Sequence, residues 1–388
     1  MKSNPELVIR GKHLVQAGAD HDISDRLRER SERSLYVFAK GVMNMKDFTT
    51  RLHLPICNWL QAPQPRKKVL LIPRSCFKTT MARCMGIHMT IQQPLTNPYF
   101  PGRAGNNLRI LFAAETEKRA ISRISWIRRQ YESNELLRYL WPDLMWHTLS
   151  EAPNWVLTHF SLPREEDYPE STFEAAGVDS GSTGSHYDVT IKDDIIGQRC
   201  RKMPELIPAA IEWFKTSHSL ADNLKLYRDY VIGTRWAAFD VYSWIDENKI
   251  DYECLTKQII NDAFEESSIL FPERFSLEEI LDMKRTQPEL FWLNYMNKPI
   301  GHGETAFNMG LVGKCQITGD DYHGYLDFDD SEKTREILEV IERGQTFDSK
   351  KETRPKKFWE LTPEERSKQW LDMQKDWTAR RMTQLECT

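Results

Sequence analysis

The sequence predicts an α/β protein with a mainly parallel central sheet, and three observations lead to this prediction. Apolar runs typical of strands alternate over the first 300 residues with segments of helical periodicity. The run VLLIP at 69–73 is apolar throughout, as strands covered on both faces usually are. After residue 300 the chain is charged and offers no further series of strands. We therefore expect a helical segment at 1–45, an α/β domain at 46–300, and a linker with a helical, charged tail at 301–388.

The elements of the domain follow from local patterns. Apolar residues at helical spacing predict a helix over 23–45. The run LRILFAA at 108–114 predicts a strand, and Thr116 is a good N-cap for the helix after it. The apolar side of that helix carries Ala120, Ile121, Ile124, Ile127 and Tyr131. Further strands are expected at 154–160, 171–178, 188–192 and 230–234.

Composition is typical of a globular protein that dissolves in water. The chain has 388 residues, of which 40% are hydrophobic and 28% charged, with a net charge of −4. No apolar run approaches the roughly 18 residues of a membrane span. The N-terminus lacks the apolar core of a signal peptide, so we expect a cytosolic protein without a membrane partner. The seven cysteines are scattered without a CxxC pair, which favours reduced thiols over disulfides or zinc.

Charge is distributed unevenly along the chain. Residues 1–150 contain 24 Lys and Arg against 12 Asp and Glu, a net charge of +12. The remaining residues contain 29 basic and 45 acidic side chains, a net charge of −16. Two interpretations stay open: the basic half binds a polyanion such as nucleotide or nucleic acid, or the two halves neutralise each other across an interface.

The run VLLIPRSCFKTT at 69–80 has the order of a phosphate-binding loop: strand, turn and helix. In such loops the backbone N–H groups and the helix N-terminus face the phosphates, a Lys reaches the β- and γ-phosphates, and a hydroxyl binds Mg²⁺. The run differs from GxxxxGK[ST], because Arg74 opens the loop and Phe77 replaces the last glycine. We expect Phe77 to fit without a positive φ. The candidate nucleotide-binding residues here are Arg74, Ser75, Cys76, Phe77, Lys78, Thr79 and Thr80.

A second motif follows about 115 residues later. The run HYDVTIKDD at 186–194 is a strand that ends in two carboxylates, the arrangement of a Walker B motif. Asp193 would hold Mg²⁺ through water together with Thr79, and Asp194 would orient or deprotonate the attacking water. Taken alone, each of these two motifs is also typical of an ordinary strand end without a ligand. Together they predict a RecA-type P-loop ATPase that uses ATP and Mg²⁺.

A third motif, YVIGTRW at 230–236, is a strand with a small polar tip. In a RecA-like sheet such a tip lies near the γ-phosphate, so Thr234 joins the candidate nucleotide-binding residues. Trp236 is better explained as an aromatic that packs at the strand end.

Four segments in order resemble the ATPase half of the large terminase subunit of tailed bacteriophages. They are PRSCFKTT, ESTFEAAGVDSGSTGSHYDVTIKDDIIG, VIGTRW and SSILFPERFSLEEILDMKRTQPELFWLNYMNKP. The resemblance covers about residues 45–300. It implies a RecA/ASCE-type fold in which Asp194, Lys78 and Arg74 are catalytic. Lys78 contacts phosphate, Asp194 stands in place of the more usual Glu, and Thr79 and Asp193 hold Mg²⁺. Arg74 matches a basic residue common near the start of the terminase loop, and Gly233 and Thr234 match a coupling motif.

The resemblance implies a motor subunit that hydrolyses ATP and moves double-stranded DNA into a procapsid in the host cytoplasm. The implied partners are DNA, a portal protein, a small terminase subunit and further copies of the chain in a ring. Such rings usually need an arginine finger from a neighbouring subunit, for which Arg119, Arg123, Arg128 and Arg129 are candidates. Two alternatives remain: another RecA-like nucleic-acid motor, or a module that binds DNA or a capsid component without hydrolysis.

Large terminases usually carry a C-terminal nuclease with clustered Asp residues that bind two metal ions. Here the tail offers the segment LDFDD, with Asp327, Asp329 and Asp330 nearly adjacent. An amphipathic helix is expected at 332–344, and Thr362 with Glu365 predicts a capped helix further on. We therefore expect no nuclease activity from this chain. The nuclease would then be a separate polypeptide, truncated or lost.

Overall fold

The computed structural model describes residues 21–179, 184–237, 239–248, 250–298, 316–320 and 323–327. The chain divides into two compact units, Met1–Ala306 and Phe307–Thr388. Within the described residues, none of the helices has the length and hydrophobicity of a membrane span.

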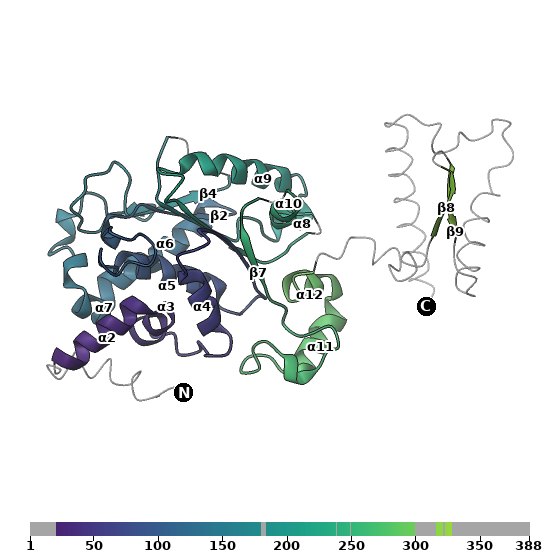
Figure 1. Cartoon of the computed structure of the whole chain (residues 1–388), viewed down its shortest axis with the longest axis horizontal. Helices are drawn as coiled ribbons and strands as arrows, with labels where there is room; N and C mark the ends of the chain where they lie inside the picture. The colour runs from purple at the N-terminus through teal and green to yellow at the C-terminus, as the bar shows by residue number, and fades with distance from the viewer. Residues whose placement is uncertain are drawn as a thin grey trace. The chain divides into compact units, whose positions relative to one another are not determined.

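A seven-stranded sheet forms the centre of the first unit (Figure 1). Its strands are β1 (Lys67–Leu71), β2 (Ile110–Ala114), β3 (His159–Phe160), β4 (Phe173–Gly177), β5 (Val189–Asp193), β6 (Arg228–Gly233) and β7 (Glu253–Thr256). They lie in the order β3-β4-β2-β5-β6-β1-β7. Every ladder is parallel except the one between β3 and β4. The predicted α/β class and the mainly parallel sheet are therefore confirmed.

Helices surround this sheet. They are α2 (His21–Arg33), α3 (Leu35–Val37), α4 (His53–Gln61), α5 (Lys78–Thr90), α6 (Glu117–Ser133), α7 (Glu135–Leu140), α8 (Arg199–Lys202), α9 (Leu206–Thr216), α10 (Val241–Glu247), α11 (Leu277–Thr286) and α12 (Pro288–Asn294). Shorter turns are the π-helical η1 (Phe38–Val42) and the 3₁₀ turns η2 (Gly105–Asn107), η3 (Pro142–Leu144), η4 (Leu149–Glu151), η5 (Ser217–Leu220) and η6 (Glu266–Ser268).

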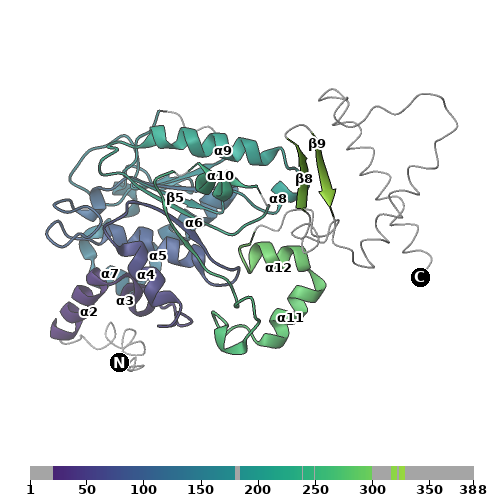
Figure 2. The same ribbon diagram turned by 45° about the vertical axis from the view of Figure 1, so that its right-hand side comes forward.

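Both faces of the sheet are covered, because alternate strand residues point to opposite sides. On one face, Leu70 and Phe112 belong to the same core as side chains of α4, α5 and α6. On the other face, Val69 and Val231 pack with residues of α9 and α10. Figures 1 and 2 show α9 and α10 on one side of the sheet and α4 and α5 on the other. This explains the continuous apolar run of β2, whereas β1, β5 and β6 also bury charged side chains, among them Lys68, Lys192 and Arg228.

The helix predicted over 23–45 is broken at Ser34. This residue has an extended backbone, with φ −142° and ψ 112°, and its side chain accepts a hydrogen bond from the N–H of Val37. A serine hydroxyl competes with the helical backbone in this way, so α2 ends and α3 begins. Thr116, by contrast, caps α6 as predicted, by accepting from the N–H of Arg119.

Two edge strands differ from the predictions. β3 covers only two residues of the expected 154–160. β7 was not predicted, because its four residues are mostly exposed and lack an apolar run. Both lie at the edges of the sheet, where a strand is covered less and its sequence pattern is correspondingly weaker.

The second unit contains a hairpin in a segment that was expected to be helical. Strands β8 (Gln316–Asp320) and β9 (His323–Asp327) pair antiparallel, with Gln316 opposite Asp327. Two residues separate them, a spacing typical of tight hairpins, but each strand is short and contains a glycine. Asp329, Asp330 and the two helices predicted in the tail lie outside the described residues.

Candidate functional site

The three predicted motifs meet at the carboxyl edge of the sheet. β6 lies between β1 and β5, with Leu71 of β1 beside Gly233 and Asp193 of β5 beside Ile232. The turn after β1 and the tips of β5 and β6 therefore lie together. In open α/β sheets this edge is where ligands bind.

Direct contacts join the two main motifs. Lys78 and Thr79 begin α5. The Thr79 hydroxyl donates to Oδ1 of Asp193 over 3.0 Å, although 114 residues separate them in sequence. The Lys78 amine lies 3.4 Å from Oδ2 of Asp194. The structure thus brings together Lys78, Thr79, Asp193 and Asp194, the four residues to which the motifs assign the central chemical roles.

The turn before α5 has the backbone of a glycine-type loop without its glycines. Ser75 and Phe77 have positive φ values of 65° and 59°. The prediction that Phe77 would not need a positive φ is therefore wrong. Its ring lies 5.9 Å from that of Phe48 and 6.2 Å from that of Phe271, and the Arg274 guanidinium lies 5.0 Å above it. These contacts offset the roughly 1–2 kcal/mol that left-handed backbone costs a residue with a side chain.

Asp193 is wholly buried, and side chains of the same chain contact both of its oxygens. Thr79 contacts Oδ1, and Nε of Arg123 lies 2.9 Å from Oδ2. The sequence offered Arg123 only as one of four possible arginine fingers for a neighbouring subunit. In this structure its guanidinium pairs with a carboxylate of its own chain.

Asp194 lies in an environment that suits an acid or base. Burial raises its pKa above the ordinary value, Lys78 opposes this, and the Asp193 carboxylate adds to it. Its Oδ1 atom is buried and has no hydrogen-bond partner among the described residues. An oxygen left in this way is available to a bound water molecule or ligand.

Tyr242 is a neighbour of the carboxylates that the sequence did not indicate. Burial, and after it the charge of Asp194, raise its pKa well above the ordinary value. Its hydroxyl is buried without a hydrogen-bond partner in the described part of the chain. A Cβ at Gly233 would overlap this hydroxyl. Gly233 at the tip of β6 thus makes room for the Tyr242 hydroxyl. No local sequence pattern predicts this contact.

The other predicted residues differ in their exposure and contacts. Arg74 is exposed and stacks on Trp236, with its guanidinium 5.2 Å from the ring. Cys76 points into the core, where burial raises its pKa to about 12, so it can offer a ligand only its backbone. Thr234 is buried, and Thr80 is half-buried in the first turn of α5.

The oxygen atoms at this edge fit Mg²⁺ bound together with a nucleotide. Thr79 and Asp193 offer hard oxygen ligands of the kind that Mg²⁺ prefers. In the described ranges, no group of three or more His, Cys, Asp or Glu residues is placed so that it could hold a metal ion. A metal cage made by protein alone is therefore not indicated there. Mg²⁺ commonly needs only one or two carboxylates when phosphates supply further ligands.

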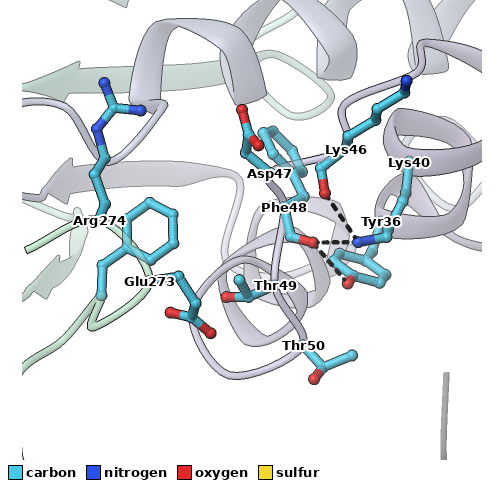
Figure 3. Close-up of a pocket in the computed structure, with 10 residues that line it drawn as sticks. Tyr36, Lys40, Lys46, Asp47, Phe48, Thr49, Thr50, Glu273 and Arg274 are labelled. Carbon is cyan, nitrogen blue, oxygen red and sulfur yellow. Dashed lines mark hydrogen bonds between the residues drawn. The ribbon is translucent and has the colours of Figure 1, made fainter.

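A cavity of about 490 Å³ lies beside the loop (Figure 3). Phe48 and Phe271, two of its walls, are the rings that pack on Phe77. Lys40 donates to the backbone oxygens of Phe48 and Lys46 over 2.6 and 3.2 Å, as the dashed lines in Figure 3 show. The lining of the cavity combines aromatic, charged and hydroxyl side chains: Tyr36, Lys40, Lys46, Asp47, Phe48, Thr49, Thr50, Phe271, Glu273 and Arg274.

Comparison with known proteins gives no match: no family model and no curated protein sequence is similar to this chain. Because a fold of this class hosts many activities, function has to be inferred from the site.

Proposed function

We propose that this chain is an ATPase of the RecA-type P-loop class. The observation that supports this most strongly is the meeting of two distant motifs: Lys78 and Thr79 at the start of α5 contact Asp194 and Asp193 at the end of β5. The strand order adds support, since β6 separates the loop strand from the strand that ends in the carboxylates. An ordinary strand–helix turn would not need this convergence.

The proposed roles follow from the positions of the side chains. The N-terminus of α5 and the Lys78 amine bind and neutralise the phosphates. Thr79 and Asp193 hold Mg²⁺, which neutralises charge on the transferring phosphate when it is bound. Asp194 orients the attacking water and accepts its proton. A pKa raised by burial suits this role, because a base works best when its pKa is near the working pH.

The cavity beside the loop is the proposed place for the nucleoside. Its volume of about 490 Å³ falls within the approximate 300–1,000 Å³ range of small-molecule sites. Thr49 of its lining can offer a hydroxyl to base or sugar. Phe48 and Phe271, which also line the cavity, pack on Phe77, the residue directly before Lys78. A nucleotide could therefore occupy the cavity and the loop together.

Among ATPases, we propose a motor that moves double-stranded DNA into a procapsid, with a portal protein, a small terminase subunit and further copies of the chain as partners. The support is the ordered resemblance of four segments to phage large terminases and the net charge of +12 over residues 1–150. The alternative, a module that has lost hydrolysis through Phe77, is less favoured. Phe77 has the positive φ that a glycine would supply there, so the loop backbone is retained.

The test is phosphate release from ATP with Mg²⁺, measured beside equilibrium ATP binding. Asp194→Asn keeps the shape of the side chain but removes the base. We expect turnover to fall by at least ~100-fold, the low end of general-base contributions, with ATP affinity nearly unchanged. Asp282→Asn, an exposed position on α11, is the matched control and should behave as the unchanged chain does. Equal turnover in the two variants would reject the role of Asp194.

A further inference from the structure

Asp193 poses a problem that the proposed function leaves open. Its carboxylate is wholly buried, and a buried charge requires a compensating partner. Lys78, the nearest lysine in the site, is directed to Asp194. The Thr79 hydroxyl contributes a hydrogen bond but no positive charge. Before any metal binds, a cation of the protein must therefore balance Asp193.

Arg123 provides that cation from α6. Its Nε lies 2.9 Å from Oδ2 of Asp193, and its side chain is 15% exposed. The guanidinium thus holds one of the two oxygens that Asp193 could offer to a metal ion or its bound water, while its partial exposure leaves it a route to move. Arg83 of α5 is a second cation whose charge interacts with Asp193. Burial lowers the pKa of Arg83, and the Asp193 carboxylate opposes this shift. The Arg83 guanidinium stacks on Trp126, 5.4 Å from the ring.

We propose that Arg123 is an internal substitute for the metal ion. It neutralises Asp193 while the site is empty and gives up this carboxylate when Mg²⁺ and nucleotide bind. Arg123 is then a positioning residue: it keeps Asp193 charged and correctly oriented, and it sets how readily metal can enter. This inference rests on the proposed function, since it takes Asp193 as a metal ligand.

A direct consequence is competition between Arg123 and metal. Metal has to displace a charge-assisted hydrogen bond before it can reach Oδ2 of Asp193. Without nucleotide, whose phosphates would supply further ligands, metal binding should therefore be weak. Removing the guanidinium should make the empty site bind metal more tightly, even though an ion pair has been lost. A purely structural ion pair predicts the opposite, because its loss would disorder Asp193.

The experiment measures Mn²⁺ binding to the full chain without nucleotide, by the loss of the free Mn²⁺ electron paramagnetic resonance signal. We expect Arg123→Ala to bind Mn²⁺ at least about tenfold more tightly than the unchanged chain, a lower bound for removing a hydrogen bond between charged groups. Arg123→Lys keeps the charge, so its Mn²⁺ affinity should stay within about threefold of that of the unchanged chain. Lys118→Ala, which removes an exposed cation of the same helix, is the matched control and should change nothing.

Arg123→Gln provides a second neutral variant in case Arg123→Ala does not fold. The proposal is overturned if the folded neutral variants bind Mn²⁺ no more tightly than Lys118→Ala does. If the unchanged chain hydrolyses ATP but the neutral variants bind Mn²⁺ with the same affinity as the unchanged chain, only the role of Arg123 is rejected and the proposed ATPase function stands. Tighter Mn²⁺ binding that Asp193→Asn fails to abolish would show that the metal binds elsewhere, and would likewise reject the proposal.

Discussion

At the scale of single residues, Phe77 shows how a phosphate loop can form without its usual glycine. The residue has φ 59° and ψ 24°, and its ring is held between Phe48, Phe271 and the Arg274 guanidinium. Two opposing effects therefore act at this position. The backbone conformation is unfavourable for a residue with a Cβ, whereas the ring contacts are favourable.

Substitutions at Phe77 separate these effects. Phe77→Ala loses the ring but keeps the strained backbone, whereas Phe77→Gly loses the ring and relieves the strain. We expect Phe77→Gly to be the more stable of the two by about 1 kcal/mol in free energy of unfolding. Urea denaturation of the paired variants measures this difference. An alanine variant as stable as the glycine variant would mean that residue 77 does not adopt the left-handed backbone.

The residues of the site divide into those that sequence could and could not indicate. Asp193 and Asp194 follow directly on the apolar part of β5, and Lys78 and Thr79 begin the helix after β1, so local patterns indicate both motifs, and the resemblance implies that they meet. Arg123 and Tyr242 lie within helices, and whether such residues reach a strand tip depends on how the helix packs. Their own sequence surroundings therefore carry no signal of the contact.

At the scale of elements, a buried histidine fixes α2 against α5. Nε2 of His88 lies 2.9 Å from the backbone oxygen of Ser31, and its Nδ1 lies 2.9 Å from the Tyr99 hydroxyl. With a backbone oxygen as acceptor, Nε2 donates and Nδ1 accepts. Burial lowers the pKa of His88 from 6.5 to about 4, so the folded chain holds the ring neutral at physiological pH.

The pH dependence of stability follows from this shift. Between pH 6.5 and about 4 the unfolded chain binds a proton at His88 that the folded chain does not. Stability from this residue is therefore full above pH 6.5 and is lost as the pH falls through this window, up to on the order of 3 kcal/mol. In His88→Gln this contribution is absent. Denaturation curves from pH 7 to pH 4 should show the unchanged chain losing more free energy of unfolding than His88→Gln does. Parallel pH profiles of the two would contradict a lowered pKa at His88.

The elements that were predicted well are the ones whose signal is local. β1, β2 and β6 are buried on both faces and contain the apolar runs VLL, ILFAA and YVI, which predict strands from sequence. The break at Ser34 and the exposed edge strand β7 depend on a cap and on a neighbouring strand instead. Such features are set by tertiary contacts, which override residue preferences.

At the scale of the whole molecule, the order of strands could be expected only from the resemblance. Local patterns give strands but not their neighbours, and here β6 lies between two strands that precede it in sequence. The absence of a nuclease also stays a prediction. The described part of the tail contains one hairpin, with Asp327 as the last residue of β9, and the rest of the acidic cluster lies outside it.

The charge asymmetry predicts how the chain binds DNA. If the net charge of +12 over residues 1–150 contacts phosphates, binding should be independent of sequence. A log–log plot of affinity against salt should then fall with a slope of about −0.9 for each phosphate contacted. Titrations of two unrelated duplexes from low to physiological salt would measure it. An affinity that stays flat would favour the other interpretation, in which the basic and acidic halves neutralise each other.

The most direct test of the central claim is phosphate release from ATP by the chain and by Lys78→Ala. Lys78 begins α5 and lies 3.4 Å from Asp194, so it is the cation that would meet the phosphates. We predict hydrolysis that requires Mg²⁺ and disappears in Lys78→Ala, whereas Lys225→Ala, an exposed lysine, retains it. Turnover in Lys78→Ala equal to that of the unchanged chain would contradict the proposed phosphate site.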